Sequence, residues 1–251
     1  MSGADERRFG GIARLYGADG AHRLGQAHVA IVGIGGVGSW SAEALARSGV
    51  GTLTLIDLDV VAESNVNRQI HAQDSNFGKA KVTAMAERIR EYSPRCQVHT
   101  VDDFLSPDNA EALLDRSFDA LIDATDQVKA KCAMIAFCAQ RTTYLVTIGA
   151  AGGQIDPTRV RADDLARTVQ DPLLARVRAE LRKQYGFPRQ TGKRFGVDAI
   201  YSEEPLRNPP AACAPPSGSA GLNCAGFGSS ICVTATFGFA AAASVINRLA
   251  L

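Results

Sequence analysis

The sequence lacks the features that mark several common functional classes. Its six cysteines include no CxxC pair, which argues against a four-cysteine zinc site and against a thioredoxin-type redox motif. The formal net charge is only +1, so any binding of nucleic acid would need a local basic patch. The N-terminal stretch MSGADERRFGG has no apolar core of the kind found in signal peptides. These absences favour a cytoplasmic protein with reduced, buried thiols.

One apolar segment does occur, at the C-terminus. Residues 230–251 contain few charged side chains and approach the length of a membrane-spanning helix. They are also rich in Ala, Gly, Ser and Thr, and no basic flank precedes them to fix an orientation in a membrane. We therefore expect a helix packed closely into the protein core, with membrane association through this helix as the alternative.

The hydrophobic pattern of the first 150 residues alternates between strand and helix periods. Short apolar runs predict strands at residues 28–33, 53–57, 97–104, 119–124 and 144–150. Helical spacing predicts helices at residues 39–47, 79–92 and 128–140, and Ser106-Pro107 predicts the start of another. This alternation indicates a Rossmann-like α/β fold with a doubly wound, mostly parallel sheet covered on both faces.

The character of the sequence changes after residue 152. We expect an N-terminal arm at residues 1–25, a nucleotide-binding domain at 26–152 and a C-terminal extension at 153–251. In the extension, Asp171-Pro172 predicts the start of a helix that runs to about Tyr185 and ends at Gly186. One side of this helix is apolar and the other is basic. Residues 205–228 are rich in Pro, Gly, Ala and Ser, which predicts a mobile loop.

A glycine-rich turn is the first functional motif. Gly33, Gly35 and Gly38 form GxGxxG directly between a predicted strand and a predicted helix. In that context the missing β-carbons let phosphate oxygens approach backbone N–H groups at the positive end of the helix. Asp57 ends the next strand, where a carboxylate can accept hydrogen bonds from ribose hydroxyls. Both features are shared with nicotinamide-dependent dehydrogenases, so by themselves they indicate only a nucleotide.

Four further polar or charged side chains distinguish a site for a triphosphate from a site for a dinucleotide. Asn65, Arg68 and Lys81 follow the second strand, and Asp126 follows the fourth. A triphosphate needs cations, a metal ion and a carboxylate to hold that ion. Taken singly, each residue has a simpler interpretation: solvated loop residues, a surface lysine and a helix cap. Their joint occurrence at one sheet edge favours a site for ATP and Mg²⁺.

With these motifs, the chain resembles the ubiquitin-activating-enzyme-like superfamily, which adenylates carboxylates. The resemblance implies that the ATP site comprises Gly33, Gly35, Gly36, Gly38, Asp57, Asn65, Arg68, Lys81 and Asp126. It implies that Asp126 binds magnesium while Arg68 and Lys81 bind the phosphates. In these homodimers an N-terminal arginine reaches the partner's ATP, and Arg14 in RFGGIARLYG is the matching residue.

Additional segments place the chain in one branch of that superfamily. GIGGVGSW, NVNRQIHA, GAGGQIDP, DLARTVQDPL and NCAGFGSS make it similar to the branch that modifies tRNA, while the paired CxxC motifs of the sulfur-carrier branch are missing. The resemblance implies ATP-dependent cyclisation of threonylcarbamoyladenosine in tRNA, with loss of water. The threonyl carboxylate would be adenylated, and a neighbouring group of the same modification would then attack it.

Other site residues follow from the basic segment and from the resemblance. The tRNA phosphates are expected to contact the basic helix at Arg176, Arg178, Arg182 and Lys183. Cys224 lies in a glycine-rich stretch similar to that of a functional cysteine in relatives, so it is a candidate sulfur acceptor or substrate-pocket residue, with simple packing as the alternative. A sulfur-relay or cysteine desulfurase partner is implied on the same ground. His71 is a candidate to line the site.

Three competing functions remain open from the residues alone. An adenylyltransferase for the C-terminus of a ubiquitin-like sulfur carrier would share the ATP site and differ only in the acceptor. An NAD-dependent oxidoreductase is consistent with the glycine turn and Asp57. A non-catalytic binding module would need none of the charged residues for activity.

Overall fold

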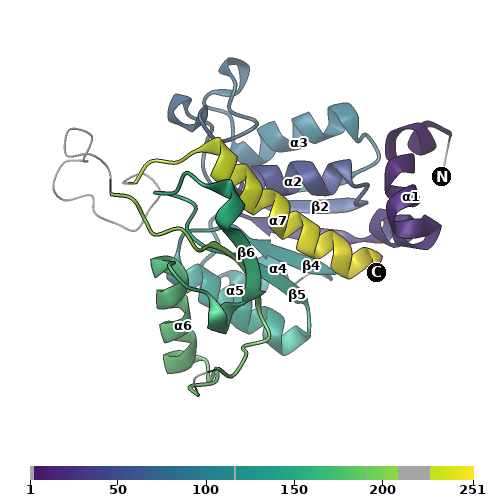
Figure 1. Cartoon of the computed structure of the whole chain (residues 1–251). Helices are drawn as coiled ribbons and strands as arrows, with labels where there is room; N and C mark the ends of the chain where they lie inside the picture. The colour runs from purple at the N-terminus through teal and green to yellow at the C-terminus, as the bar shows by residue number, and fades with distance from the viewer. Residues whose placement is uncertain (1–2, 116, 191, 209–226) are drawn as a thin grey trace.

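The computed structural model describes residues 3–115, 117–190, 192–208 and 227–251. Seven strands form one sheet in the order β3-β2-β1-β4-β5-β7-β6, seen nearly edge-on between two layers of helices in Figure 1. The strands are β1 (His28–Val32), β2 (Thr52–Ile56), β3 (Gln97–Val101), β4 (Ala120–Asp123), β5 (Tyr144–Ile148), β6 (Val160–Asp164) and β7 (Asp198–Ser202). All neighbouring pairs are parallel except β6 and β7. The predicted doubly wound parallel sheet is confirmed.

Helices cover both faces of this sheet because the central strands are apolar on both sides. Val29 and Ile31 of β1 belong to a core shared with α2 (Gly38–Arg47), α3 (Lys81–Tyr92) and α7 (Ile231–Ala250). Ala30 and Val32 belong to a second core with α4 (Ala110–Leu114), α5 (Val128–Arg141) and α6 (Pro172–Gln184). Such continuous apolar strands are typical of parallel sheets buried between helices.

The apolar C-terminal segment forms α7, which packs against the sheet and α2. Among the described residues it is the one helix that length and composition would allow to cross a membrane, with a mean hydropathy of 1.3. A β-carbon at Gly238 would lie 2.6 Å from the carbonyl oxygen of Val37. Ser41 Oγ donates a 3.0 Å hydrogen bond to the carbonyl oxygen of Gly238. The small residues of this segment therefore allow close packing between helices, as expected.

The N-terminal segment is helical, which the sequence did not predict. Helix α1 (Gly3–Gln26) is interrupted at Gly17, where φ is +78°. It lies beside the amino ends of the strands, because Leu24 near its end accepts a hydrogen bond from the N–H of Gly51, the residue before β2. Ala27, just after α1, accepts one from Thr52 at the start of β2. Tyr16 donates to Asn247 of α7 at 2.8 Å. The expected arm is thus a kinked helix at the edge opposite the strand carboxyl ends (Figure 1).

Two predictions for the region after β3 were wrong. The strand ends at Val101 and does not continue to residue 104. Ser106-Pro107 does not begin a helix, because α4 starts at Ala110. Instead, Asn109 Oδ1 accepts hydrogen bonds from the backbone N–H and the hydroxyl of Ser106, at 2.8 and 3.2 Å. This side-chain bonding offers the backbone an alternative to a helical turn.

The C-terminal extension contributes to the same sheet as the rest of the chain. Beyond β5 it supplies β6, β7, two 3₁₀ turns, α6 and α7 among the described residues. Helix α6 was predicted with its Asp171 cap and its Gly186 end. The two strands were missed because VRADD and DAIYS carry few apolar residues. The remaining short turns are Glu63–Asn65, Asp74–Asn76, Pro157–Arg159 and Leu165–Arg167. Most of the predicted loop at residues 205–228 lies outside the described residues.

Candidate active site

A cavity opens where the chain reverses its direction across the sheet. From β1 the chain crosses to β2, and from β4 it crosses to β5 on the other side, so that β1 and β4 are the neighbouring strands at the switch point. Open α/β sheets bind ligands in the crevice at this point, beyond the strand carboxyl ends. The cavity measures about 420 Å³. Its lining includes the ends of β1, β2, β4 and β5 and two residues next to or in α7.

The glycine turn between β1 and α2 requires its glycines. Gly33 has a φ of +89°, and a β-carbon there would lie 2.8 Å from the carbonyl oxygen of Ala124. A β-carbon at Gly38 would lie only 1.8 Å from the carbonyl oxygen of Gly33. In the described residues, no side chain caps the N-terminus of α2 after Val37. Ser39 and Trp40 N–H already donate to the carbonyl oxygens of Gly35 and Val37. The N–H groups of Gly35, Gly36 and Val37, just before α2, have no partner among the described residues and are available to an anionic ligand.

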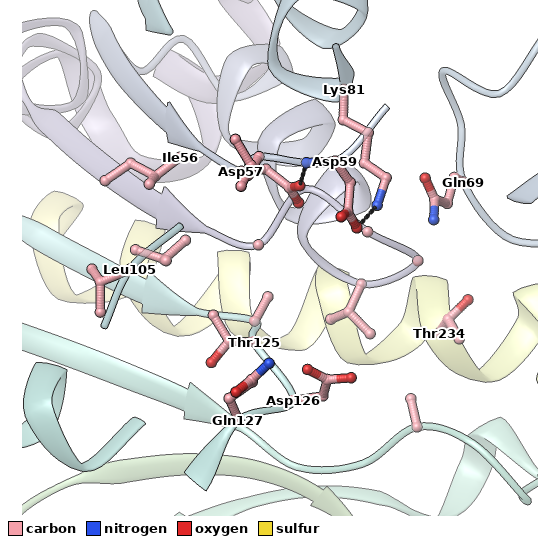
Figure 2. A pocket seen from close by; sticks show the side chains of 18 of the residues that line it. Ile56, Asp57, Asp59, Gln69, Lys81, Leu105, Thr125, Asp126, Gln127 and Thr234 are labelled. Carbon is pink, nitrogen blue, oxygen red and sulfur yellow. Dashed lines mark hydrogen bonds and ion pairs between the residues drawn. The ribbon is translucent and has the colours of Figure 1, made fainter. Parts of the chain in front are cut away.

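Two aspartates and a lysine form the β2 side of the cavity. Asp57 Oδ2 accepts a hydrogen bond from Ile34 N–H at 2.6 Å, and Oδ1 accepts one from Asp59 N–H at 2.8 Å. Burial raises the pKa of the Asp57 carboxyl, while the charge of Lys81 lowers it. Lys81 Nζ lies 2.6 Å from Asp59 Oδ2, as Figure 2 shows. The Lys81 side chain is only 8% exposed and that of Asp59 is 74% exposed, so the lysine is held in the cavity wall.

Arg68 also lines the cavity, whereas Asn65 does not. The Arg68 side chain runs across Gly36, where a β-carbon would lie 2.9 Å from Arg68 Cγ. Its guanidinium donates to the carbonyl oxygen of Ser64 at 2.8 Å and to Asn67 Oδ1 at 2.9 Å. Asn65 Oδ1 instead accepts the N–H of Ala62 at 3.1 Å. In this structure Asn65 therefore supports the turn that presents Arg68.

Asp126 lies on the opposite wall, beyond the end of β4. Figure 2 shows Asp126 and Gln127 across the cavity from Asp57, Asp59 and Lys81. Asp126 is exposed, and α5 begins two residues later at Val128, where no side chain of a described residue makes a cap bond. The alternative interpretation of Asp126 as a helix cap is therefore wrong. Its carboxylate is free to hold a cation in the cavity.

Several lining residues were not predicted from the sequence. Gln69 is 5% exposed and its Oε1 has no hydrogen-bond partner among the described residues. Asp59, Gln127, Ser229 and Thr234 also line the cavity, and Ile56, Phe104 and Leu105 give it an apolar end. Gln69 and Asp59 adjoin predicted site residues and could have been found by extending those motifs. Ser229 and Thr234 carried no such signal because only the fold brings α7 to this edge.

Three other predicted residues, Gly38, Arg14 and His71, do not line the cavity. Gly38 begins α2 behind the turn, Arg14 is exposed on α1, and Cys224 lies outside the described residues. His71 does not line the site. It is 1% exposed beside a separate cavity of about 230 Å³, and neither ring nitrogen has a partner among the described residues. Burial, followed by the charges of Lys81 and Arg88, lowers the pKa of His71 to about 4.

The four predicted basic residues of α6 differ in their surroundings. Arg176 and Lys183 are exposed. Arg178 donates to the Thr168 hydroxyl, and burial, followed by the charge of Arg182, lowers its pKa. Arg182 donates to the carbonyl oxygen of Pro188 at 3.2 Å and lies over the Phe195 ring. Two of the four side chains therefore have intramolecular contacts, and two point freely to solvent.

The arrangement suits a nucleotide triphosphate with a cation. The walls supply Lys81, Arg68 and the N–H groups of the glycine turn for phosphate oxygens, and Asp126 faces them. Among the described residues, no group of three His, Cys, Asp or Glu side chains is placed to hold a metal ion. A single carboxylate fits Mg²⁺, which is commonly bound by one or two carboxylates together with substrate phosphates and waters.

Comparisons with known proteins identify the family and several relatives of this chain. A family model described as the ThiF family matches residues 10–246. The tRNA threonylcarbamoyladenosine dehydratase of Haemophilus influenzae is 50% identical over 247 residues, which is 97% of this chain and 94% of that protein. The structure of the E. coli tRNA N6-threonylcarbamoyladenosine dehydratase, TcdA, in complex with ATP has 46% sequence identity and a TM-score of 0.90, covering 99% of this chain and 96% of that one. A second structure of the E. coli protein contains AMP, with the same identity, TM-score and coverage.

Proposed function

Because the chain belongs to the ThiF family, we propose that it is an ATP-dependent enzyme that converts N6-threonylcarbamoyladenosine in tRNA to its cyclic form with loss of water. One observation carries this conclusion: the 50% identity to a dehydratase of this substrate extends over almost the full length of both chains. The similarity therefore includes the C-terminal extension, which is the part expected to differ in an enzyme that acts on another acceptor. The cavity supplies the charged groups that an adenylation reaction needs.

The lining of the cavity supports a specific orientation of ATP. The apolar end at Ile56, Phe104 and Leu105 fits the adenine ring, and Asp57 is placed to accept ribose hydroxyls. The phosphates would then lie over the glycine turn, with Arg68 and Lys81 as their cations. Lys81 would exchange its exposed partner Asp59 for a phosphate oxygen. Asp126 faces this position and would hold a Mg²⁺ ion, which would supply positive charge to stabilise the phosphates.

The reaction follows from this placement. An oxygen of the threonyl carboxylate attacks the α-phosphorus, the bond from that phosphorus to the oxygen shared with the β-phosphate breaks, and pyrophosphate leaves. A neighbouring nucleophile of the same modification then attacks the carbonyl carbon of the acyl-AMP, loses its proton, and AMP leaves. Adenylation thereby converts a poor leaving group into a good one, and the ring closure gains from proximity because both groups belong to one nucleoside. The net change in the nucleoside is the loss of one water.

We further propose that the enzyme is a homodimer in which Arg14 acts across the interface. Within one chain, Arg14 is on α1 beside the amino ends of the strands, whereas the cavity is at their carboxyl ends. An intramolecular contact between Arg14 and the phosphates is therefore not available in this fold. The resemblance that assigns Arg14 to the partner's ATP site is consistent with that separation. A cytoplasmic location and a sulfur-relay or cysteine desulfurase partner at Cys224 remain proposals from sequence.

The expected product provides the direct test of the activity. Incubation with ATP, Mg²⁺ and tRNA that carries threonylcarbamoyladenosine should give a nucleoside lighter by one water, together with AMP and pyrophosphate. Mass spectrometry of the digested tRNA measures this change. Unmodified tRNA is the control and should release no pyrophosphate. An unchanged nucleoside mass, combined with pyrophosphate exchange stimulated by a small carrier protein, would instead establish the sulfur-carrier adenylyltransferase.

The exposed basic residues of α6 are proposed to contact tRNA phosphates. Replacing Arg176 and Lys183 with glutamine should weaken tRNA binding and reduce the slope of log Kd against log salt by about 2, since each lost phosphate contact removes about one unit. The KM for ATP should not change, because neither residue lines the cavity. Filter binding at several salt concentrations measures the slope. Arg90→Gln, an exposed arginine on α3, serves as the control, and an equal effect there would refute the assignment.

A further inference from the structure

Three ionisable side chains are buried together beneath the cavity. Lys131 of α5 and Asp123 at the end of β4 are fully buried, and Asp171 before α6 is 5% exposed. None of them is among the described residues that line the cavity. Buried charges are costly unless they are paired and hydrogen-bonded, and an apolar pair of similar volume would often stabilise a fold as well. Their presence under the site therefore calls for a reason other than stability.

Lys131 joins the ends of two neighbouring strands. Its Nζ donates to the carbonyl oxygen of Ile148 at 2.6 Å and lies 3.1 Å from Asp123 Oδ2. The Thr147 hydroxyl also donates to Asp123 Oδ2, at 2.7 Å. The last registered pair between β4 and β5 is Asp123 with Thr147. Lys131 thus connects the two strands where their backbone pairing stops and the walls of the cavity begin.

From Asp123 the contacts continue to the wall that carries Asp126. Asp123 Oδ1 accepts hydrogen bonds from the backbone N–H and the hydroxyl of Thr125, at 3.2 and 2.8 Å. Thr125 directly precedes Asp126, and both line the cavity, as Figure 2 shows. The Asp123 carboxylate therefore contacts Lys131 through Oδ2 and fixes the Thr125 backbone through Oδ1. Thr125 belongs to the segment that is proposed to bind magnesium.

Asp171 fixes the neighbouring floor of the cavity. Its Oδ2 accepts the N–H of Ala150 at 2.9 Å, and its Oδ1 caps α6 by accepting the N–H of Leu174 at 2.9 Å. A β-carbon at Gly149 would lie 1.8 Å from Asp171 Oδ2, so this close approach requires glycine. Burial raises the pKa of the Asp171 carboxyl, whereas these hydrogen bonds and the charge of Lys131 lower it. Gly149, Ala150 and Ala151 all line the cavity.

We propose that Lys131 is a positioning residue for adenylation, which it serves by fixing the distance between the Asp126 wall and the Gly149–Ala151 floor. The inference rests on the proposed function. The acceptor carboxylate has to lie between this floor and the α-phosphate, with the attacking oxygen about 3–3.5 Å from phosphorus. A shift of about 1 Å in such a geometry can reduce the rate on the order of a hundredfold. Lys131 acts through Asp123 and the strand ends, without touching the substrates.

The test removes the buried charges of Lys131 and Asp123 in a variant that should still fold. Lys131→Met alone leaves Asp123 buried without its cation and is expected to destabilise the fold. The double variant with Lys131→Met and Asp123→Asn removes both charges, so it should fold with a Tm close to that of the wild type. It should retain nucleotide binding, measured as the Tm shift with ATP, because the nucleotide contacts are intact. Its kcat for pyrophosphate release with modified tRNA should fall about thirtyfold or more, while the KM for ATP changes little.

Lys129→Met is the matched control, because Lys129 is exposed on the same helix and should leave all these quantities unchanged. A folded double variant with the kcat of the wild type would overturn the proposal, and so would a double variant that cannot fold, since the network would then serve stability. If the wild type and Lys129→Met release no pyrophosphate with modified tRNA, the proposed function itself fails. A fall in kcat in the folded double variant, with full activity in the wild type and in Lys129→Met, supports the positioning role of Lys131.

Discussion

Asp126→Asn is expected to reduce kcat for cyclisation at least about a hundredfold, with little change in Tm. The amide keeps the size of the side chain but loses the charge that would hold Mg²⁺ against the phosphates, and electrostatic groups aimed at a transition state are commonly worth a hundred- to a thousandfold. Asp126 is exposed and accepts none of the described hydrogen bonds that hold the Thr125 turn. Folding should therefore not depend on it. Formation of AMP with modified tRNA measures the effect.

Asp102→Asn is the control for that variant. Asp102 is an exposed aspartate just beyond β3, at the same edge of the sheet, but it does not line the cavity. Its replacement should leave kcat within about twofold of the wild type, as for most surface changes. An Asp126→Asn enzyme with full activity at all Mg²⁺ concentrations would show that Asp126 has no role in the reaction.

Asp126→Asn can also be used to test whether Arg14 acts in the site of the partner subunit. In a mixture of Asp126→Asn and Arg14→Ala protomers, a mixed dimer contains one site with both native residues and one site with neither. If protomers exchange freely, half of the dimers are mixed, so about a quarter of the wild-type activity should return from two inactive parents. Activity that stays at the level of the separate variants would show that Arg14 does not act across an interface.

The second large effect is expected at the glycine turn. Gly38→Ala should lower Tm by about 10 °C and abolish protection by ATP, because the new β-carbon would be placed 1.8 Å from the carbonyl oxygen of Gly33. Relief of that overlap requires movement of the turn backbone against α2, at a cost of about 3 kcal/mol or more. The turn would then no longer present its N–H groups to the phosphates. Thermal denaturation with and without ATP measures both effects.

Gly25→Ala provides a matched glycine near the end of α1. A β-carbon at that position meets no other described atom within 4 Å, and alanine is the better helix former. This variant should keep the wild-type Tm or raise it slightly, with unchanged protection by ATP. Equal stability of the two variants would mean that the turn tolerates a side chain and that its glycines have no structural necessity.

The motifs of the proposed ATP site could be recognised in the sequence because each is local in the chain. The glycine turn, Asp57, Arg68, Lys81 and Asp126 all follow strand ends that hydrophobic patterning located within a few residues. Parallel strands bring such ends to one edge, so sequence order alone predicted their proximity. Asn65 shows the limit of this argument. Its side chain accepts a bond from Ala62 three residues away, and a motif pattern does not distinguish support of a turn from contact with a ligand.

The sequence by itself determined the parallel sheet, the glycine turn and the charged residues at the strand ends, because periodicity and turn chemistry act over a few neighbouring residues. Only the tertiary structure placed α7 against the cavity and α1, the helix that carries Arg14, at the opposite end of the sheet. It also joined Lys131, Asp123 and Asp171, which lie up to 48 positions apart, beneath the site. Such contacts depend on which faces of the helices pack together, and that is decided by burial of the whole core and not by any local pattern.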